Sequence, residues 1–240
     1  MYPILLQFGP ITIYSYGFFL ALAFLAASML AERESQIRNF PPYFISNLCL
    51  LCLVSGVIGA RIFFIILNFD FFKQDPYEII KLWHGGLVWY GGLISGVAAG
   101  LIYVRIKKQA VLPVLDLMAP YLALGQAIGR IGCFLNGCCY GKIWPGVNIF
   151  YPTQVFSSLI MLFVFLVLRI LQKRNLKTGN IFFLYLIFYS GKRFFIEFLR
   201  GDSPSIFLGF TIFQLISAGI FMIALIFLLF CQADLNRRKL

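Results

Sequence analysis

The stretch G-R-I-G-C-F-L-N-G-C-C-Y-G, from Gly129 to Gly141, differs in composition from the sequence around it. It combines one arginine, four glycines, one asparagine and three of the six cysteines of the chain. The flanking sequence is mostly apolar. Groups that carry charge, form hydrogen bonds or let backbones approach closely are therefore concentrated here, and we expect this stretch to form one wall of a functional site.

The composition around this stretch is that of an integral membrane protein. The 240 residues are 61% hydrophobic and 12% charged, with a mean hydropathy of +0.89, whereas soluble domains are about 25% charged. The apolar runs are continuous, which favours membrane-spanning helices over a β-barrel. Positions 1–10 lack Lys and Arg and hold two prolines, so the first run is expected to be retained and not cleaved as a signal peptide.

We predict an all-α fold of about seven transmembrane helices in a single polytopic domain, residues 1–240. The expected spans are 11–31, 44–68, 85–105, 113–136, 152–171, 180–199 and 206–231. With the N-terminus outside, twelve Lys and Arg lie on the cytoplasmic side and four lie outside. This asymmetry predicts an outside N-terminus and a cytoplasmic C-terminus.

The net charge of +11 is explained by these basic connections, and no pattern for nucleic-acid binding is present. The chain has a single histidine, and its cysteines do not follow a zinc-binding spacing. We therefore expect no metal site and no cofactor. Cys49 and Cys52 lie within an apolar run, where cysteine most often acts as a small hydrophobic residue.

In this topology polar groups from five segments fall at one depth, just below the outer surface. Ionisable residues inside a span are costly and usually face a cavity. Their agreement in depth predicts one site. The groups are Tyr14 and Tyr16, Arg61, His84, Arg130, and the set Lys192, Arg193 and Glu197.

Arg130 and Arg193 are the candidate phosphate-binding residues, because a guanidinium can grip a lipid phosphate with two parallel hydrogen bonds. Alternatively, Arg130 extends to the membrane interface and its neighbouring glycines serve helix packing. Arg193 and Glu197 are spaced to pair on one helix face, with Tyr189 on the same face. That pair either fixes a second phosphate clamp or is a plain structural ion pair.

The remaining candidates are polar groups near the same depth. His84 opens H-G-G-L and has the side-chain pKa best suited to a general base, although a lone histidine at an interface is often structural. Asn136 and Gln154 are expected to hydrogen-bond a polar headgroup or each other. Asp116 lies at the opposite end of its span and is expected to be structural. Cys133, Cys138 and Cys139 fit three alternatives: packing residues, a disulfide, or a reactive thiol.

Four motifs occur in this order along the chain: H-G-G-L with a second glycine pair, G-R-I-G-x-F-L-N-G, Y-P-T-Q at the start of a span, and R-F-x-x-E-F-x-R. Together with Tyr16-Gly17 in the first span, they resemble the bacterial prolipoprotein diacylglyceryl transferase family over nearly the whole chain. The signature usual in that family has Asn and Glu where this chain has Cys133 and Cys138. Its H-P-S-Q motif begins here with Tyr151.

The resemblance implies transfer of a diacylglyceryl group from phosphatidylglycerol to the lipobox cysteine of preprolipoproteins, in the bacterial inner membrane with the site toward the outer leaflet. Phosphatidylglycerol, the preprolipoprotein signal peptide and membrane lipids are then the expected partners. It implies catalytic roles for His84, Arg130, Arg193 and Glu197. It implies substrate binding by Tyr16, Asn136, Gly137, Gln154 and Tyr189 as well as by the two arginines. The alternatives are a membrane thiol-redox protein using the three cysteines, and a divergent lipid-binding homologue.

Overall fold

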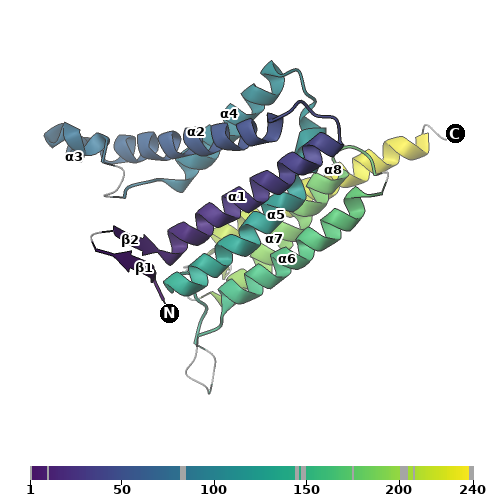
Figure 1. Cartoon of the computed structure of the whole chain (residues 1–240). Helices are drawn as coiled ribbons and strands as arrows, with labels where there is room; N and C mark the ends of the chain where they lie inside the picture. The colour runs from purple at the N-terminus through teal and green to yellow at the C-terminus, as the bar shows by residue number, and fades with distance from the viewer. Residues whose placement is uncertain are drawn as a thin grey trace. The chain divides into compact units, whose positions relative to one another are not determined.

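A computed structural model describes residues 2–9, 11–81, 85–143, 146, 150–174, 176–200, 205–207 and 209–237. Within these ranges six helices are long and apolar enough to cross a membrane, which confirms an all-α integral membrane protein (Figure 1). They are α1 (Ser15–Ile37), α2 (Phe44–Leu67), α4 (Trp89–Ile106), α5 (Val111–Asn136), α6 (Thr153–Gln172) and the stretch Ile212–Phe230 of α8 (Ile212–Arg237).

The seventh expected span is helix α7 (Asn180–Leu199), which has the predicted bounds. It differs from the other six because Lys192, Arg193 and Glu197 make it more charged. That α7 crosses the membrane therefore remains a prediction.

Two expected spans begin later than predicted because short hairpins precede them. Strands β1 (Ile4–Phe8) and β2 (Ile11–Tyr14) pair antiparallel, so the first helix starts at residue 15 and not 11. Strands β3 (Ser205–Phe207) and β4 (Phe210–Thr211) likewise precede α8. Gly9 and Gly209 have φ angles of 57° and 79° in the two turns, a conformation that glycine adopts without steric cost.

The third expected span also starts late, at Trp89 instead of residue 85. Gly85 and Gly86 have φ angles of 82° and 79°, which a right-handed helix does not accommodate. Between α2 and this segment lie two short helices, α3 (Phe69–Gln74) and the 3₁₀ helix η1 (Pro76–Ile79).

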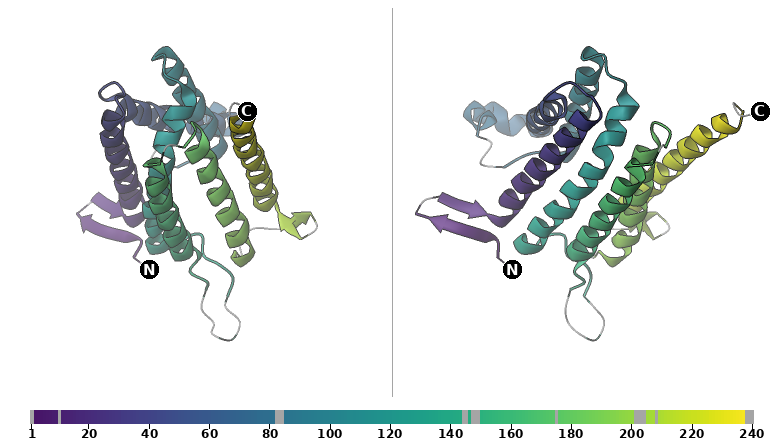
Figure 2. Two further views of the ribbon diagram at one scale, coloured as in Figure 1. Left: turned by 90° about the vertical axis from the view of Figure 1, so that its right-hand side faces the viewer. Right: turned by 45° about the vertical axis from the view of Figure 1, so that its right-hand side comes forward.

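The chain forms two compact units, residues 1–31 with 112–240, and residues 32–111. In the first unit α7 packs between α6 and α8, and both views of Figure 2 show α7 beside these helices. A buried cluster from α5, α6 and α7 forms its core: Ala119, Ala123, Ala127, Met161, Val164, Leu168, Ile181 and Tyr185. The expectation of one domain stays a prediction.

The second unit is built on the close approach of α2 and α4. A Cβ atom added at Gly91 would lie 2.6 Å from the carbonyl oxygen of Gly59, so small residues are required where the two helices meet. Arg61 is 7% exposed and donates hydrogen bonds to backbone carbonyls between Glu78 and Gly86. Its guanidinium therefore holds the segment that precedes α4.

Candidate active site

The Arg130 end of α5 is positioned by α1. At Gly132 the two backbones come so close that an added Cβ would lie 2.9 Å from the Phe19 Cβ and 3.4 Å from the Tyr16 Cα. Nothing lies within 4 Å of a Cβ added at Gly129. Gly132 is therefore required for the close packing of α5 against α1, whereas Gly129 is not.

Arg130 lines a small pocket in the first unit, which we call the basic pocket. Its walls come from α5, from the turn after α5, from the first turns of α6 and from the last turns of α7. Its cavity volume is only about 10 Å³, room for about one water molecule, against roughly 300–1,000 Å³ for sites that enclose whole drug-sized ligands. The lining residues are Arg130, Cys139, Thr153, Ser157, Lys192, Arg193, Ile196 and Arg200.

The basic pocket is strongly unbalanced in charge. Among the described residues four of its lining side chains are cationic, and none is a carboxylate. Lys192 is 8% exposed, and its Nζ lies over the ring of Tyr189 at 4.8 Å. Among the described residues, neither Lys192 nor Arg130 has a carboxylate partner. Buried charges are normally paired, so this arrangement favours an anionic ligand.

Glu197 supplies a negative charge beside Arg193 and Arg200. Its side chain is fully buried; Arg193 Nη2 lies 3.2 Å and Arg200 Nε lies 3.8 Å from Glu197 Oε2. The Thr211 hydroxyl donates a hydrogen bond to Oε1 at 3.2 Å. The contact from Arg193 is an ion pair but is not aligned as a hydrogen bond. Glu197 therefore holds Arg193 at the pocket through this ion pair.

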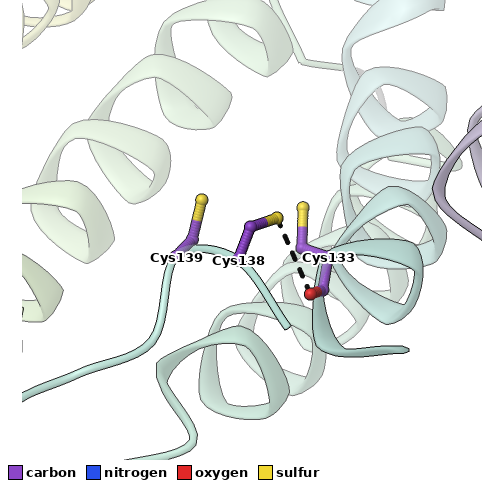
Figure 3. A group of neighbouring side chains, drawn as sticks. All are labelled: Cys133, Cys138 and Cys139. Atoms are coloured by element: carbon purple, nitrogen blue, oxygen red, sulfur yellow. Dashed lines mark hydrogen bonds between the residues drawn. The ribbon is translucent and has the colours of Figure 1, made fainter. Parts of the chain in front are cut away.

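The wall opposite α7 is the turn that ends α5. Gly137 has a φ angle of 76°, and the amides of Gly137 and Cys138 donate to the carbonyls of Phe134 and Cys133 at 3.3 and 3.2 Å. This is the Schellman motif, in which a left-handed residue closes a helix. The motif returns the chain toward the last turn of α5, so that Cys138 lies beside Cys133 (Figure 3).

Two buried side chains from the first turn of α6 hold this turn in place. The Thr153 hydroxyl donates to the Cys139 carbonyl, and Gln154 Nε2 donates to the Cys138 carbonyl, both at 2.7 Å. Each of the two α6 side chains is 2% exposed. Cys139 itself has a φ angle of 59°, a left-handed conformation that costs a non-glycine residue about 1–2 kcal/mol. The hydrogen bonds offset this cost.

The sulfur atoms of Cys133, Cys138 and Cys139 lie within 4.8 Å of one another (Figure 3). All three cysteines are free thiols. The neighbouring Cys133 thiol and the positive charges of Arg130 and Arg200 lower the pKa of the Cys139 thiol, although burial acts in the opposite direction. A thiol and a set of cations thus share the basic pocket.

The structure brings together part of the predicted site. Arg130 and Arg193 both line the basic pocket, Glu197 supports Arg193, and Tyr189 lies beneath Lys192. The roles expected for them remain predictions. Gly137 forms the turn, and Gln154 is occupied by the Cys138 carbonyl.

Other predicted residues do not line the basic pocket, although Tyr16 lies beside the same end of α5. Asn136, at the end of α5, and Tyr16, in the first turn of α1, are exposed and do not line the basic pocket. Arg61 belongs to the second unit, where its donors are bound by backbone carbonyls. His84 lies outside the described residues.

Sequence reasoning grouped Lys192 with the site by its depth and offered Cys139 as a possible reactive thiol, but it did not select Arg200; all three line the basic pocket. A signal for Arg200 was present, because it follows Glu197 by three residues. The place of Cys139 in the pocket could not be derived from spacing, because it depends on the turn at Gly137.

Comparisons with known proteins identify the family of this chain. The model of the family described as prolipoprotein diacylglyceryl transferase matches residues 3–230. Three relatives named phosphatidylglycerol–prolipoprotein diacylglyceryl transferase are similar to this chain. The protein of Clostridium tetani is 35% identical over 84% of this chain and 86% of its own length. Those of Bacillus licheniformis and Symbiobacterium thermophilum are 33% and 31% identical, over 92% and 94% of this chain and 89% and 91% of their own lengths. The chain belongs to the prolipoprotein diacylglyceryl transferase family.

Proposed function

We propose that this protein transfers the diacylglyceryl group of phosphatidylglycerol to the lipobox cysteine thiol of preprolipoproteins, the first step of bacterial lipoprotein maturation. The observation that carries the proposal is the basic pocket, where the described lining residues include four cationic side chains and no carboxylate. Family membership supports the reaction, and the names of the relatives support its donor and acceptor.

The positive charge of the basic pocket suits a phosphate headgroup. Arg130 and Arg193 present planar guanidinium groups that can bind phosphate oxygens in pairs. Lys192 adds a positive charge in a water-poor environment, where electrostatic interactions are stronger than in bulk water. The acyl chains then stay in the surrounding lipid, and the donor enters sideways from the membrane.

The reaction forms a bond between the acceptor sulfur and a glycerol carbon and breaks the bond between that carbon and a phosphate oxygen. The thiol must lose its proton, because the thiolate is the nucleophile. The electron pair of the broken bond stays on the departing glycerol phosphate. Arg130, Lys192 and Arg193 stabilise this developing charge, which is the main source of catalysis in sites of this kind. His84 remains the proposed base.

The location of the site follows from the charge asymmetry of the connections. Twelve basic residues on one side and four on the other predict an outside N-terminus in the bacterial inner membrane. The Arg130 end of α5 and the Arg193 end of α7 then lie toward the outer leaflet. The preprolipoprotein signal peptide presents its lipobox cysteine on that side.

Substitution of Arg130 tests the phosphate-binding role. We expect Arg130→Ala to reduce transfer to a reporter preprolipoprotein by about 10²–10³, the loss typical of removing one group that stabilises transition-state charge. Arg130→Lys, which keeps the charge without the paired donors, is expected to lie between Ala and wild type. Arg105→Ala, an exposed arginine of α4, is the matched control. Wild-type rates in Arg130→Ala membranes with normal protein levels would contradict the assignment.

A further inference from the structure

The three cysteines at the end of α5 form a cluster that the phosphate-binding role does not use. Their sulfur atoms lie within 4.8 Å of one another. One comes from the last turn of α5 and two come from the turn that follows (Figure 3). Cys139 has a left-handed backbone and lines the basic pocket. A role as a small packing residue does not explain this conformation.

The geometry is close to that of a thiolate metal site. A Zn²⁺ ion binds cysteine sulfur at about 2.3 Å in a tetrahedral arrangement, which places its sulfur ligands about 3.8 Å apart. The three sulfur atoms lie within 4.8 Å of one another. Small rotations of the cysteine side chains would bring them to the spacing of about 3.8 Å that zinc requires. The backbone is already fixed, because buried Thr153 and Gln154 hold both carbonyls of the turn.

The surrounding charge also fits. Three thiolates and one Zn²⁺ carry a net charge of −1. Arg130 and Arg200 lie close enough to Cys139 to act on it electrostatically. A cluster with this net charge is therefore stabilised by its cationic neighbours, whereas three thiolates alone would repel one another.

Three protein ligands leave the fourth position of a tetrahedral zinc ion open, which is the arrangement of catalytic zinc sites. We propose that Cys133, Cys138 and Cys139 bind a Zn²⁺ ion whose open position takes the thiol of the acceptor protein. The zinc site is inferred from the geometry of the cluster. The binding of the acceptor thiol at its open position rests on the proposed function.

Coordination supplies the thiolate that the transfer needs. On binding to zinc the acceptor thiol releases its proton to the proposed base His84, since a coordinated thiol is deprotonated outright. The zinc-bound sulfur then forms the bond to the glycerol carbon, and the carbon–oxygen bond breaks with its electron pair on the phosphate. The product is a neutral thioether, a weaker ligand than a thiolate, and it leaves the ion. The ion remains Zn²⁺ throughout, so no oxidant or reductant is needed.

Metal content tests the site without reference to activity. The full chain is purified in detergent under reducing conditions, treated with a weak chelator and analysed for zinc. We expect one tightly held ion per chain in the wild type and in Cys49→Ala/Cys52→Ala, whose cysteines lie in α2. Cys139→Ser and Cys133→Ser are expected to lose it. A wild type without zinc that also fails to bind added Zn²⁺ would overturn the proposal, as would a disulfide within the cluster when thiols are blocked in intact membranes.

Replacing zinc with Co²⁺ tests the open position. Thiolate-to-cobalt charge-transfer absorption is expected in the wild type and not in Cys139→Ser. A lipobox peptide with one cysteine should change this absorption, and the same peptide with serine should not. No change with the cysteine peptide would overturn the acceptor role. A chain that passes both tests but shows no diacylglyceryl transfer would refute the proposed function and leave the metal site standing.

Discussion

Lys192 is a buried cation in contact with an aromatic ring and, among the described residues, without a carboxylate partner. A residue selected for stability alone would not be placed there, because an unpaired buried charge is costly. The arrangement is typical of a functional site that gives up stability for ligand binding. Arg130, which is partly buried in the same pocket, also has no carboxylate partner among the described residues.

Replacing Lys192 by Met should therefore separate stability from activity. We expect Lys192→Met to raise the thermal unfolding temperature of the detergent-solubilised protein by a few degrees, because the costly buried charge is removed while the aliphatic volume is kept. Diacylglyceryl transfer should fall about tenfold or more, since one phosphate-facing charge is lost. A variant with lower stability and unchanged transfer would show that Lys192 is structural. Lys107→Met, an exposed residue, is the control.

Gly141 shows a second constraint at the level of one residue. A Cβ atom added there would lie 2.6 Å from the Tyr151 Cβ and 2.7 Å from the Leu199 carbonyl oxygen. We expect Gly141→Ala to destabilise the protein by about 1–3 kcal/mol, the usual cost of overpacking. Gly129→Ala is the matched control, because its added Cβ meets nothing within 4 Å and alanine favours a helix by about 1 kcal/mol. Equal unfolding temperatures for the two variants would contradict this reading.

Among the helices, α7 depends on a capping contact that the sequence did not reveal. Asp116 was expected to be structural by complementing the dipole of its own helix. Its carboxylate instead accepts hydrogen bonds from the amides of Gly179 and Phe182, at the start of α7. A carboxylate there satisfies free amides and complements the positive end of the helix. The residue is structural, but it acts on a helix 63 residues further along the chain.

Removal of this cap should be costly. We expect Asp116→Ala to lower the free energy of unfolding by about 2 kcal/mol, at the upper end for caps because the site is buried and two amides lose their acceptor. Asp75→Ala provides a control, since Asp75 caps η1 through one exposed amide and should cost a few tenths of that amount. Thermal unfolding in detergent measures both. An equal loss in the two variants would mean that burial of the cap does not matter.

The spans of the chain could be predicted because long apolar runs and prolines mark them. The bounds of α7 matched its predicted range. The hairpins before α1 and α8 were missed, since their few residues were absorbed into apolar runs. The three cysteines were singled out from the sequence, but the close approach of their sulfur atoms could not be derived, because it depends on the left-handed turn at Gly137 and on hydrogen bonds from Thr153 and Gln154. Contacts of this kind between separate elements are not visible in local sequence spacing.

For the whole molecule, the crossing of α7 decides the topology. Seven spans put the termini on opposite sides of the membrane, whereas six put them on the same side. By composition α7 differs from the six apolar helices, yet its charges do not face lipid: Lys192 and Glu197 are 8% and 3% exposed, and α6 and α8 pack against the helix. Charged residues that face protein or a cavity are tolerated within a span. We therefore expect α7 to cross.

A reporter of membrane side, fused after the last residue, tests this expectation. With seven spans and an outside N-terminus the C-terminal reporter should be cytoplasmic, in agreement with Arg237, Arg238 and Lys239 at that end. A reporter inserted at Gly146, between α5 and α6, should be external, and one inserted at Lys177, between α6 and α7, should be cytoplasmic. An external C-terminal reporter, with the other two as expected, would show that α7 does not cross, and the Arg193 half of the basic pocket would then need a different position in the membrane.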